Sequence, residues 1–329
     1  MENRQFGRLP FEVSQLSFGA SALGGVFRNV EEGDAIRAVH AALDAGINYF
    51  DVAPAYGATR SETILGKALR GVPRDRYHIS TKVGKRVAPG QYGSDTFDFS
   101  ESAIIESLNE SRKRIGVDYF DIIHLHDIEY QGRVHVASAF GEGHATLERL
   151  KKQGRIGAVS FGIYPMDLWH RILGEVRIDA MLTHNHYCLI DTRLVQLLPA
   201  VKEKAIALIN ASPFASGLLA GRDPPDWHPI EESDRSVVLN ALRFCESHGV
   251  SIAKLALQFS ASHRDIPTTL FSSASAESVT RNVRWLEEPY EGELIDEVRG
   301  ILAPAADREW DYDAGVERLK DSGSNTGGN

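Results

Sequence analysis

Short runs of β-branched and aromatic residues alternate with amphipathic stretches along almost the whole chain of 329 residues. The apolar runs predict strands, and stretches with apolar residues three and four positions apart predict helices between them. The predicted strands are residues 13–19, 47–53, 77–83, 119–127, 155–163, 179–187, 206–214 and 267–273. The predicted helices are residues 31–46, 61–71, 100–116, 144–154, 165–174, 193–204, two or more within 234–262, and 275–286.

This alternation of strand and helix predicts a (β/α)8 TIM barrel that forms a single α/β domain over residues 1–315. A doubly wound sheet is the alternative architecture. The barrel is favoured because no GxGxxG follows the first predicted strand and no linker interrupts the helices. Residues 316–329, which end in SGSNTGGN, are expected to be a C-terminal tail with a disordered end.

Composition narrows the possible partners. The formal net charge is −9 and no basic cluster is present, which argues against nucleic acid and anionic membranes and favours a small molecule. The two cysteines, Cys188 and Cys245, lie in unrelated segments without metal-binding spacing, so we expect buried thiols and no metal. No signal peptide and no apolar run of membrane-spanning length is present. We expect a cytoplasmic protein that is a monomer or a weak homo-oligomer.

Four polar residues occupy the positions where a barrel carries its chemistry. Asp51, Lys82 and His126 end the second, third and fourth predicted strands, and Tyr56 lies just beyond the second. Side chains at the carboxyl ends of neighbouring strands meet at one side of the barrel mouth. Each residue alone also fits a structural role, but the set on consecutive strands predicts a catalytic group.

The four residue types have complementary chemistry. A free tyrosine has a pKa of about 10, which is too high for efficient proton exchange near neutrality. A nearby Lys82 ammonium favours the phenolate of Tyr56, and Asp51 keeps that ammonium charged and oriented. His126 can then hydrogen-bond the substrate oxygen that gains or loses the proton.

The segments FDVAPAYG, SETILGKAL, STK and DYFDIIHLH, in this order, resemble the aldo-keto reductase superfamily. The resemblance extends from LSFGASALGG to SAESVTRN and implies a barrel oxidoreductase with a nicotinamide cofactor. It assigns the catalytic Asp, Tyr, Lys and His to Asp51, Tyr56, Lys82 and His126. His124, on the same side of its strand as His126, is the alternative histidine.

The same resemblance implies cofactor contacts from several loops. NASPFASGLLAG resembles the family's pyrophosphate loop and indicates Ser212, Gly217 and Leu218. The other expected cofactor contacts are Gly19, Ala20, Asp51, Ser272, Ser273, Ser278 and Asn282. The family's usual SN after the fifth strand and Gln on the sixth are missing from AVSFGIYP and MLTHNHYCLID, so the contacts to the nicotinamide carboxamide are not assigned.

The choice between NAD and NADP depends on charge. Members that use NADPH carry a Lys and an Arg that bind the 2′-phosphate, and this chain has Ser272 and Ser278 at those positions. Two hydroxyls suit the plain ribose of NAD, whereas a phosphate would lose charge-assisted hydrogen bonds. NAD is therefore the expected cofactor and NADP the less favoured one, with Arg281 as a cation that could still reach a phosphate.

Three segments indicate the substrate. MLTHNHYCLID, GRDPPDWHP and ILAPAADREW resemble a branch that contains the L-galactose dehydrogenases and related aldose dehydrogenases. The branch implies oxidation of an aldose at C1 to the lactone with NAD. The alternatives are an NADPH-dependent aldehyde or ketone reductase, a dehydrogenase of another small alcohol, and a non-catalytic subunit that senses nicotinamide nucleotides.

Overall fold

Eight parallel strands close into a barrel in the computed structural model, which describes residues 1–26, 29–87, 95–222 and 228–312. The strand order around the barrel is β10-β11-β12-β3-β4-β5-β8-β9. The strands are β3 (Leu16–Gly19), β4 (Tyr49–Asp51), β5 (His78–Val83), β8 (Phe120–His126), β9 (Ile156–Gly162), β10 (Ala180–His184), β11 (Ala207–Ala211) and β12 (Thr268–Ser272). The predicted barrel is confirmed.

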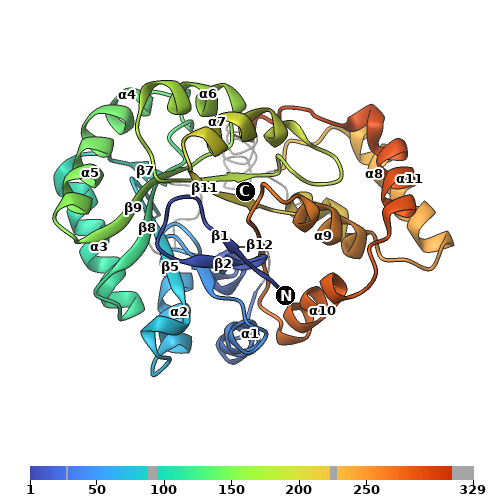
Figure 1. Cartoon of the computed structure of the whole chain (residues 1–329), viewed down its shortest axis with the longest axis horizontal. Helices are drawn as coiled ribbons and strands as arrows, with labels where there is room; N and C mark the ends of the chain where they lie inside the picture. The colour runs from blue at the N-terminus through green and yellow to red at the C-terminus, as the bar shows by residue number, and fades with distance from the viewer. Residues whose placement is uncertain (27–28, 88–94, 223–227, 313–329) are drawn as a thin grey trace, which may run out of the picture.

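Helices surround the strands (Figure 1). They are α1 (Glu32–Asp44), α2 (Arg60–Leu69), α3 (Glu101–Ile115), α4 (Val136–Ser138), α5 (His144–Lys152), α6 (Met166–Glu175), α7 (Leu198–Glu203), α8 (Glu232–Ser247), α9 (Ile252–Ser262), α10 (Ala276–Glu287) and α11 (Gly292–Leu302). The region 234–262 divides into α8 and α9, and α11 adds a helix that the sequence pattern did not predict. The expected tail, 316–329, and the boundary at residue 315 lie outside the described residues.

A hairpin closes the amino-terminal end of the barrel. Strands β1 (Asn3–Gln5) and β2 (Glu12–Ser14) pair antiparallel, and Figure 1 shows them in front of the barrel centre. The buried Phe6 ring packs edge-on against Tyr49 of β4, with ring centroids 5.6 Å apart. The predicted strand 13–19 is therefore two strands, because its first residues belong to the hairpin.

A second antiparallel hairpin, β6 (Lys85–Val87) with β7 (Asp95–Phe97), lies between β5 and α3. Sequence periodicity did not predict it, because each strand has only three residues. The hairpin follows the carboxyl end of β5 directly, so it brings Lys85 to the barrel mouth.

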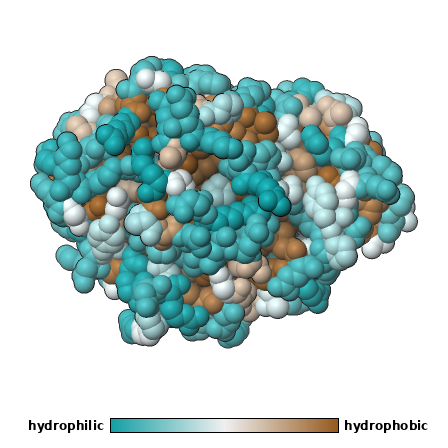
Figure 2. Space-filling view, viewed as in Figure 1, coloured by the Kyte–Doolittle hydropathy of each residue, from teal (hydrophilic) through white to brown (hydrophobic). Residues whose placement is uncertain are grey.

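One face of the protein is largely polar (Figure 2), and the two cysteines are buried. The face in Figure 2 is mostly hydrophilic, with small separate hydrophobic areas. No helix among the described residues has the length and apolar character needed to cross a membrane. Cys188 and Cys245 are buried and form no disulfide, as the sequence predicted.

The close approach of α2 to α3 gives a test of the packing. A Cβ on Gly66 would lie 2.5 Å from the carbonyl oxygen of Arg114 and 2.6 Å from Cα of Ile115. We expect Gly66→Ala to lower the free energy of unfolding by about 1 to 3 kcal/mol, since backbone must move to admit the methyl group. Gly300→Ala, in α11 with no heavy atom within 4 Å of the new Cβ, is the matched control and should be neutral or stabilising. Urea denaturation of both variants measures this, and equal stabilities would contradict the described packing.

Candidate active site

A buried ion pair lies at the carboxyl ends of β4 and β5. The Lys82 ammonium contacts Asp51 Oδ2 and donates to the carbonyl oxygen of Val52 at 3.0 Å. Each of the two charged residues is only 1% exposed. Register explains their meeting, because Asp51 pairs with Ser80 across the sheet and the Lys82 side chain continues on the same face two residues later.

Tyr56 and His126 complete the cluster that the sequence predicted. The Lys82 nitrogen lies 4.7 Å from the centroid of the Tyr56 ring. The Tyr56 and His126 rings meet edge to face, with centroids 5.9 Å apart and an interplanar angle of 86°. The structure thus brings Asp51, Tyr56, Lys82 and His126 together at one side of the mouth.

Opposing effects set the proton affinity of these groups. Burial raises the pKa of the Tyr56 phenol, and the Lys82 ammonium lowers it without cancelling the rise. Burial works against the Lys82 ammonium, but the Asp51 carboxylate outweighs it and raises the lysine pKa. Lys82 therefore remains a cation and acts on Tyr56 in the expected direction, while the net pKa of the phenol stays above its ordinary value.

Burial lowers the pKa of His126 to about 3, so its imidazole is neutral at physiological pH. Its Nε2 lies 3.4 Å from Oδ1 of Asp127. Its Nδ1 is buried and has no hydrogen-bond partner among the described residues. A neutral imidazole with one ring nitrogen free of protein hydrogen bonds can hydrogen-bond a substrate oxygen.

Residues deeper in the barrel make hydrogen bonds that hold the Asp51 carboxylate in place. Ser80 Oγ donates to Asp51 Oδ1 at 2.7 Å, and the Tyr49 hydroxyl donates to Ser80 Oγ at 2.7 Å. His124 is fully buried, with Nε2 3.5 Å from Asp51 Oδ1 and Nδ1 2.8 Å from Ser160 Oγ. His124 therefore lies beside Asp51 inside the barrel, whereas His126 contacts Tyr56. The placement favours His126 over His124 for contact with substrate.

The expected cofactor residues of the first and eighth strands lie beside Asp51. Gly19 pairs with Asp51 on one side and with Ser272 on the other, so the three residues form a row across β12, β3 and β4. Ala20 follows Gly19 and is buried. Ser272 Oγ accepts the N–H of Ala22 at 2.9 Å. Ser272 thus also fastens the segment after β3 to the end of β12.

The loop after β11 has the unusual backbone expected of a binding loop. Ser212, Ser216 and Gly217 have φ values of 64°, 56° and 106°. Left-handed conformations at residues other than glycine are strained and occur often at ligand sites. Leu218 is 2% exposed, so its side chain belongs to the core and only its backbone can meet a ligand. This loop and the amino terminus of α10 suit the phosphates of a dinucleotide.

The residues expected at the adenosine ribose lie at the start of α10. Ser275 caps the helix through the N–H of Ser278, 3.3 Å from its hydroxyl, and Ser273 precedes the cap. Asn282 is one turn further along and is 4% exposed. Arg281 donates to Ser278 Oγ at 3.2 Å and lies over the Trp285 ring. A cation therefore stands directly beside Ser278.

A cavity of about 370 Å³ opens at the mouth beside the β8 end. Its lining comes from the loop after β8, from Tyr164 and Pro165 after β9, and from the C-terminal residues 309–312. The volume falls in the range of small-molecule sites. The sequence did not predict this cavity, because its walls come from segments more than 140 residues apart.

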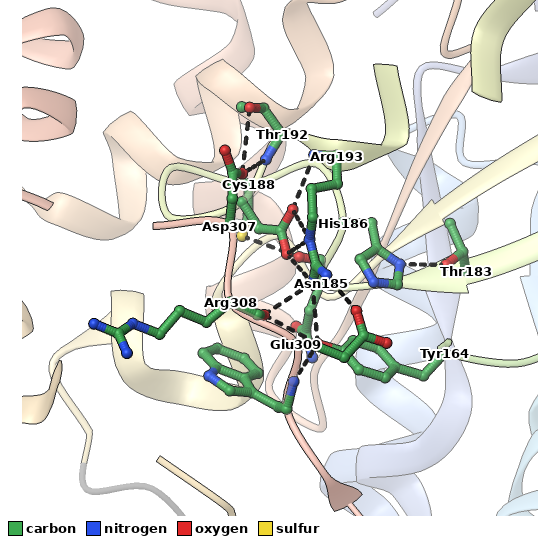
Figure 3. A network of polar contacts seen from close by, with 12 residues as sticks. Tyr164, Thr183, Asn185, His186, Cys188, Thr192, Arg193, Asp307, Arg308 and Glu309 are labelled. Carbon is green, nitrogen blue, oxygen red and sulfur yellow. Dashed lines mark hydrogen bonds and ion pairs between the residues drawn. The ribbon is translucent and has the colours of Figure 1, made fainter. Parts of the chain in front are cut away.

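Arg193 holds the C-terminal wall in place, and Figure 3 shows its side chain directed at Tyr164 and Glu309. The guanidinium pairs with Glu309 and with Asp191, and it donates to the carbonyl oxygen of Arg308 at 2.8 Å. The Tyr164 hydroxyl accepts the N–H of Trp310 at 3.0 Å. These contacts fix residues 308–310 against the loops after β9 and β10.

Comparisons with known proteins agree with this geometry. The profile of the aldo/keto reductase family matches residues 15–303. The chain belongs to the aldo/keto reductase family. It is 37% identical over 319 residues to L-galactose dehydrogenase from Arabidopsis thaliana, covering 94% of this chain and 97% of that protein. It is 31% identical over 299 residues to D-threo-aldose 1-dehydrogenase from a Pseudomonas species, covering 83% and 89%.

Among solved structures, an aldo-keto reductase from Bacillus halodurans in its holo form superposes with a TM-score of 0.77 at 25% identity, covering 95% of this chain and 99% of that one. Family membership and the named dehydrogenases make the protein an oxidoreductase with a nicotinamide cofactor. Barrel enzymes carry their chemistry at the carboxyl ends of the strands, and the candidate residues lie at or just beyond the carboxyl ends of β4, β5 and β8.

Sequence reasoning missed Glu129, Tyr164 and Arg193, which belong to the cavity and its support. Glu129 stands only three residues after His126, and that spacing was a usable signal. The sequence around Tyr164 and Arg193 carries no such signal, because their role depends on contact with the C-terminal segment.

The pH dependence of catalysis tests the role of Lys82. If the Tyr56 phenol acts as the base, it must first lose its proton. The pH profile of kcat for oxidation should then have a rising limb at the pKa of the phenol. We expect Lys82→Met to lower kcat and to shift this limb upward by about one pH unit or more, since the ammonium lowers the phenol pKa. The measurement is the rising limb of kcat for oxidation up to the highest pH at which both proteins stay folded, because the phenol pKa of wild type already lies above its ordinary value.

Two further variants control that experiment. Lys67→Met removes an exposed lysine paired with Glu32 and should change nothing. Asp51→Asn/Lys82→Met avoids a buried unpaired carboxylate, so it separates loss of folding from loss of catalysis. An unmoved limb in folded variants would mean that Lys82 does not act on the phenol.

Proposed function

We propose that the protein oxidises an aldose at C1 to the lactone with NAD. The observation that carries this proposal is the position of Tyr56, with the Lys82 ammonium at 4.7 Å from its ring and His126 edge-on against it. This arrangement provides one group for proton transfer, one cation that tunes it and one neutral hydrogen-bonding partner.

The four side chains have separate roles in the proposed reaction. The Tyr56 phenolate takes the proton of the anomeric hydroxyl, and His126 holds the same oxygen. Lys82 stabilises the phenolate, while Asp51 keeps Lys82 charged and in place. A nicotinamide held by the loops after β3, β11 and β12 would supply the acceptor for the hydride lost from C1 of the sugar. Loss of the proton and the hydride converts the cyclic hemiacetal into the lactone.

A sugar substrate is supported by the cavity and by the relatives. Aromatic side chains and carboxyl groups line the cavity, and such a lining suits a ring with apolar C–H faces and hydroxyl edges. The L-galactose and D-threo-aldose dehydrogenases named above are enzymes of sugars by name.

NAD is supported by the hydroxyl side chains Ser272 and Ser278, which stand where a phosphate-binding Lys and Arg are expected. The second candidate, an NADPH-dependent reductase, is favoured by the position of Arg281 against Ser278. The Arg281 guanidinium also lies over the Trp285 ring, 5.2 Å from its centroid. This contact holds the guanidinium in place without a phosphate, so we prefer NAD.

We also propose that the protein is cytoplasmic and acts as a monomer or a weak homo-oligomer. Analytical ultracentrifugation of the purified chain measures the assembly.

The reaction is tested by a dehydrogenase assay with NAD across L-galactose, L-fucose, D-arabinose and related aldoses. We expect NADH formation together with the lactone, which hydrolyses to the aldonate. Tyr56→Phe should reduce turnover by roughly 10²- to 10⁴-fold and leave NAD binding nearly unchanged, because the phenol transfers a proton and contributes little to cofactor contacts. More than about a tenth of wild-type activity in this variant would argue against Tyr56 as the base.

Cofactor choice has its own test. We expect Ser278→Arg to raise kcat/KM for NADP about ten-fold or more, with little change for NAD, since one charge-assisted hydrogen bond contributes roughly 1.5 to 3 kcal/mol. Ser272 stays unchanged in this variant because its hydroxyl accepts the N–H of Ala22.

Arg281→Gln is the companion variant. If NAD is the cofactor, its kcat/KM for NAD should stay within about two-fold of wild type. A wild type that prefers NADP, together with a large loss of NADP use in Arg281→Gln, would instead identify Arg281 as the phosphate contact.

A further inference from the structure

Glu129 is a buried carboxyl group with an unused oxygen. Its side chain is 9% exposed, and Oε1 accepts the N–H of Tyr164 at 2.9 Å. Oε2 has no hydrogen-bond partner among the described residues. A buried polar atom without a partner is costly, so its persistence points to a ligand that completes it.

The unused oxygen belongs to a residue that lines the cavity at the mouth. Glu129 follows His126 by three residues, and Asp127 between them has Oδ1 3.4 Å from the His126 ring nitrogen. Glu129 therefore lies on the segment that directly follows the histidine that we propose holds the reacting oxygen.

The opposite walls of the cavity are rigid. Tyr164, which donates its N–H to Glu129, stacks on His186 with centroids 4.5 Å apart. Its hydroxyl lies within the Arg193 network (Figure 3). Asn185 donates to the Tyr312 hydroxyl at 2.6 Å. Glu129 thus faces aromatic walls that are already fixed, as a binding site requires.

The charges around the cavity select against anions. The cations nearest to Glu129 are engaged by carboxylates of the protein: Lys85 by Asp127, Arg133 by Asp167, and Arg193 by Asp191 and Glu309. The lining also contains the carboxyl groups of Glu129 and Asp311, and that of Glu309, the partner of Arg193. A neutral polyhydroxylated molecule fits this field, whereas a phosphorylated sugar or an aldonate would be repelled.

We propose that Glu129 Oε2 hydrogen-bonds a ring hydroxyl of a neutral aldose and thereby selects such sugars over simple aldehydes and alcohols. The proposal rests on the aldose oxidation proposed above and adds the group that recognises the sugar. Glu129 acts here as a specificity residue. A substrate that lacks the hydroxyl would leave the buried carboxyl oxygen without a hydrogen-bond partner and would bind more weakly.

The ionisation of Glu129 gives the proposal a distinct signature. Burial, followed by the charge of Asp127, raises the pKa of Glu129 to about 8. Its other charged neighbours are Lys85, Arg133, Glu309 and Asp311. Burial holds the pKa of His126 near 3, while Lys85 and His126 hold that of Asp127 near 2 against its own burial. Between pH 6.5 and 9 Glu129 therefore changes from a neutral acid to a carboxylate, which accepts a stronger hydrogen bond.

The test compares wild type with Glu129→Gln, which keeps an oxygen for the Tyr164 N–H and loses the ionisation. With L-galactose, or the best aldose of the panel, we expect the ratio of wild-type to variant kcat/KM to rise from below about three at pH 6.5 to about ten or more at pH 9. Ionisation of Tyr56 affects both proteins equally and cancels in this ratio. The loss should appear in KM more than in kcat, because the contact is made on binding.

Monodeoxy analogues of the same aldose provide a second measurement that does not depend on folding of a variant. One analogue, which lacks the hydroxyl bound by Glu129, should lower kcat/KM of wild type and show a ratio near one at every pH. Reduction of propanal with NADH should be the same in wild type and Glu129→Gln. Glu175→Gln, which removes an exposed carboxylate paired with Arg171, is the matched control and should leave every rate unchanged.

The outcomes separate the two proposals. A wild type that oxidises the aldose, with a ratio that is independent of pH or equal for all analogues, would overturn the role of Glu129 alone. A wild type that oxidises no aldose with NAD but reduces propanal would overturn the proposed function and the role of Glu129 together. Faster turnover of a phosphorylated aldose than of the free sugar would show that the cavity does not select neutral substrates.

Discussion

The buried pair of Lys82 and Asp51 is the interaction on which the site depends. Removing two such charges from water costs several kcal/mol per ion, and their attraction offsets this only with further hydrogen bonds. Here Ser80 and the Val52 carbonyl provide them. The pair therefore requires β4 and β5 to lie side by side in one register, which a closed parallel barrel fixes. The charge that tunes Tyr56 is thus a direct consequence of the fold.

Burial has two opposite effects at this site. It strengthens the influence of Lys82 on the Tyr56 phenol, since less water screens the charge. It also raises the phenol pKa, and this second effect is the larger one. A phenol that keeps its proton near neutrality is a ready acid for reduction, whereas oxidation requires it to ionise. Under the proposed function the same geometry serves both directions, and a rise in pH shifts the balance toward oxidation.

The sequence predicted the parts of the structure that depend on local pattern. Each barrel strand is an apolar run bounded by turns, and Asp51, Lys82 and His126 mark strand ends, so their convergence follows from the barrel alone. The β6–β7 hairpin was missed because three-residue strands leave no periodic signal. The contact of Arg281 with Ser278 depends on a side-chain rotamer, which spacing cannot give. The walls of the cavity depend on Tyr164 and Arg193 meeting residues 308–310, a contact between distant segments.

The residues proposed for proton transfer depend on neighbouring strands, whereas the cavity depends on contacts between distant segments. The proposed proton-transfer group lies on neighbouring strands and includes the buried ion pair of Lys82 and Asp51. The cavity depends on loops after β8, β9 and β10 and on the C-terminal segment, which Arg193 fastens from outside the barrel. Under the proposed function, substitutions in these loops would leave the Lys82–Asp51 pair intact and change only which substrate hydroxyls are accepted. Glu129 joins the two regions, since it follows His126 on β8 and also binds the backbone of Tyr164 on the cavity wall.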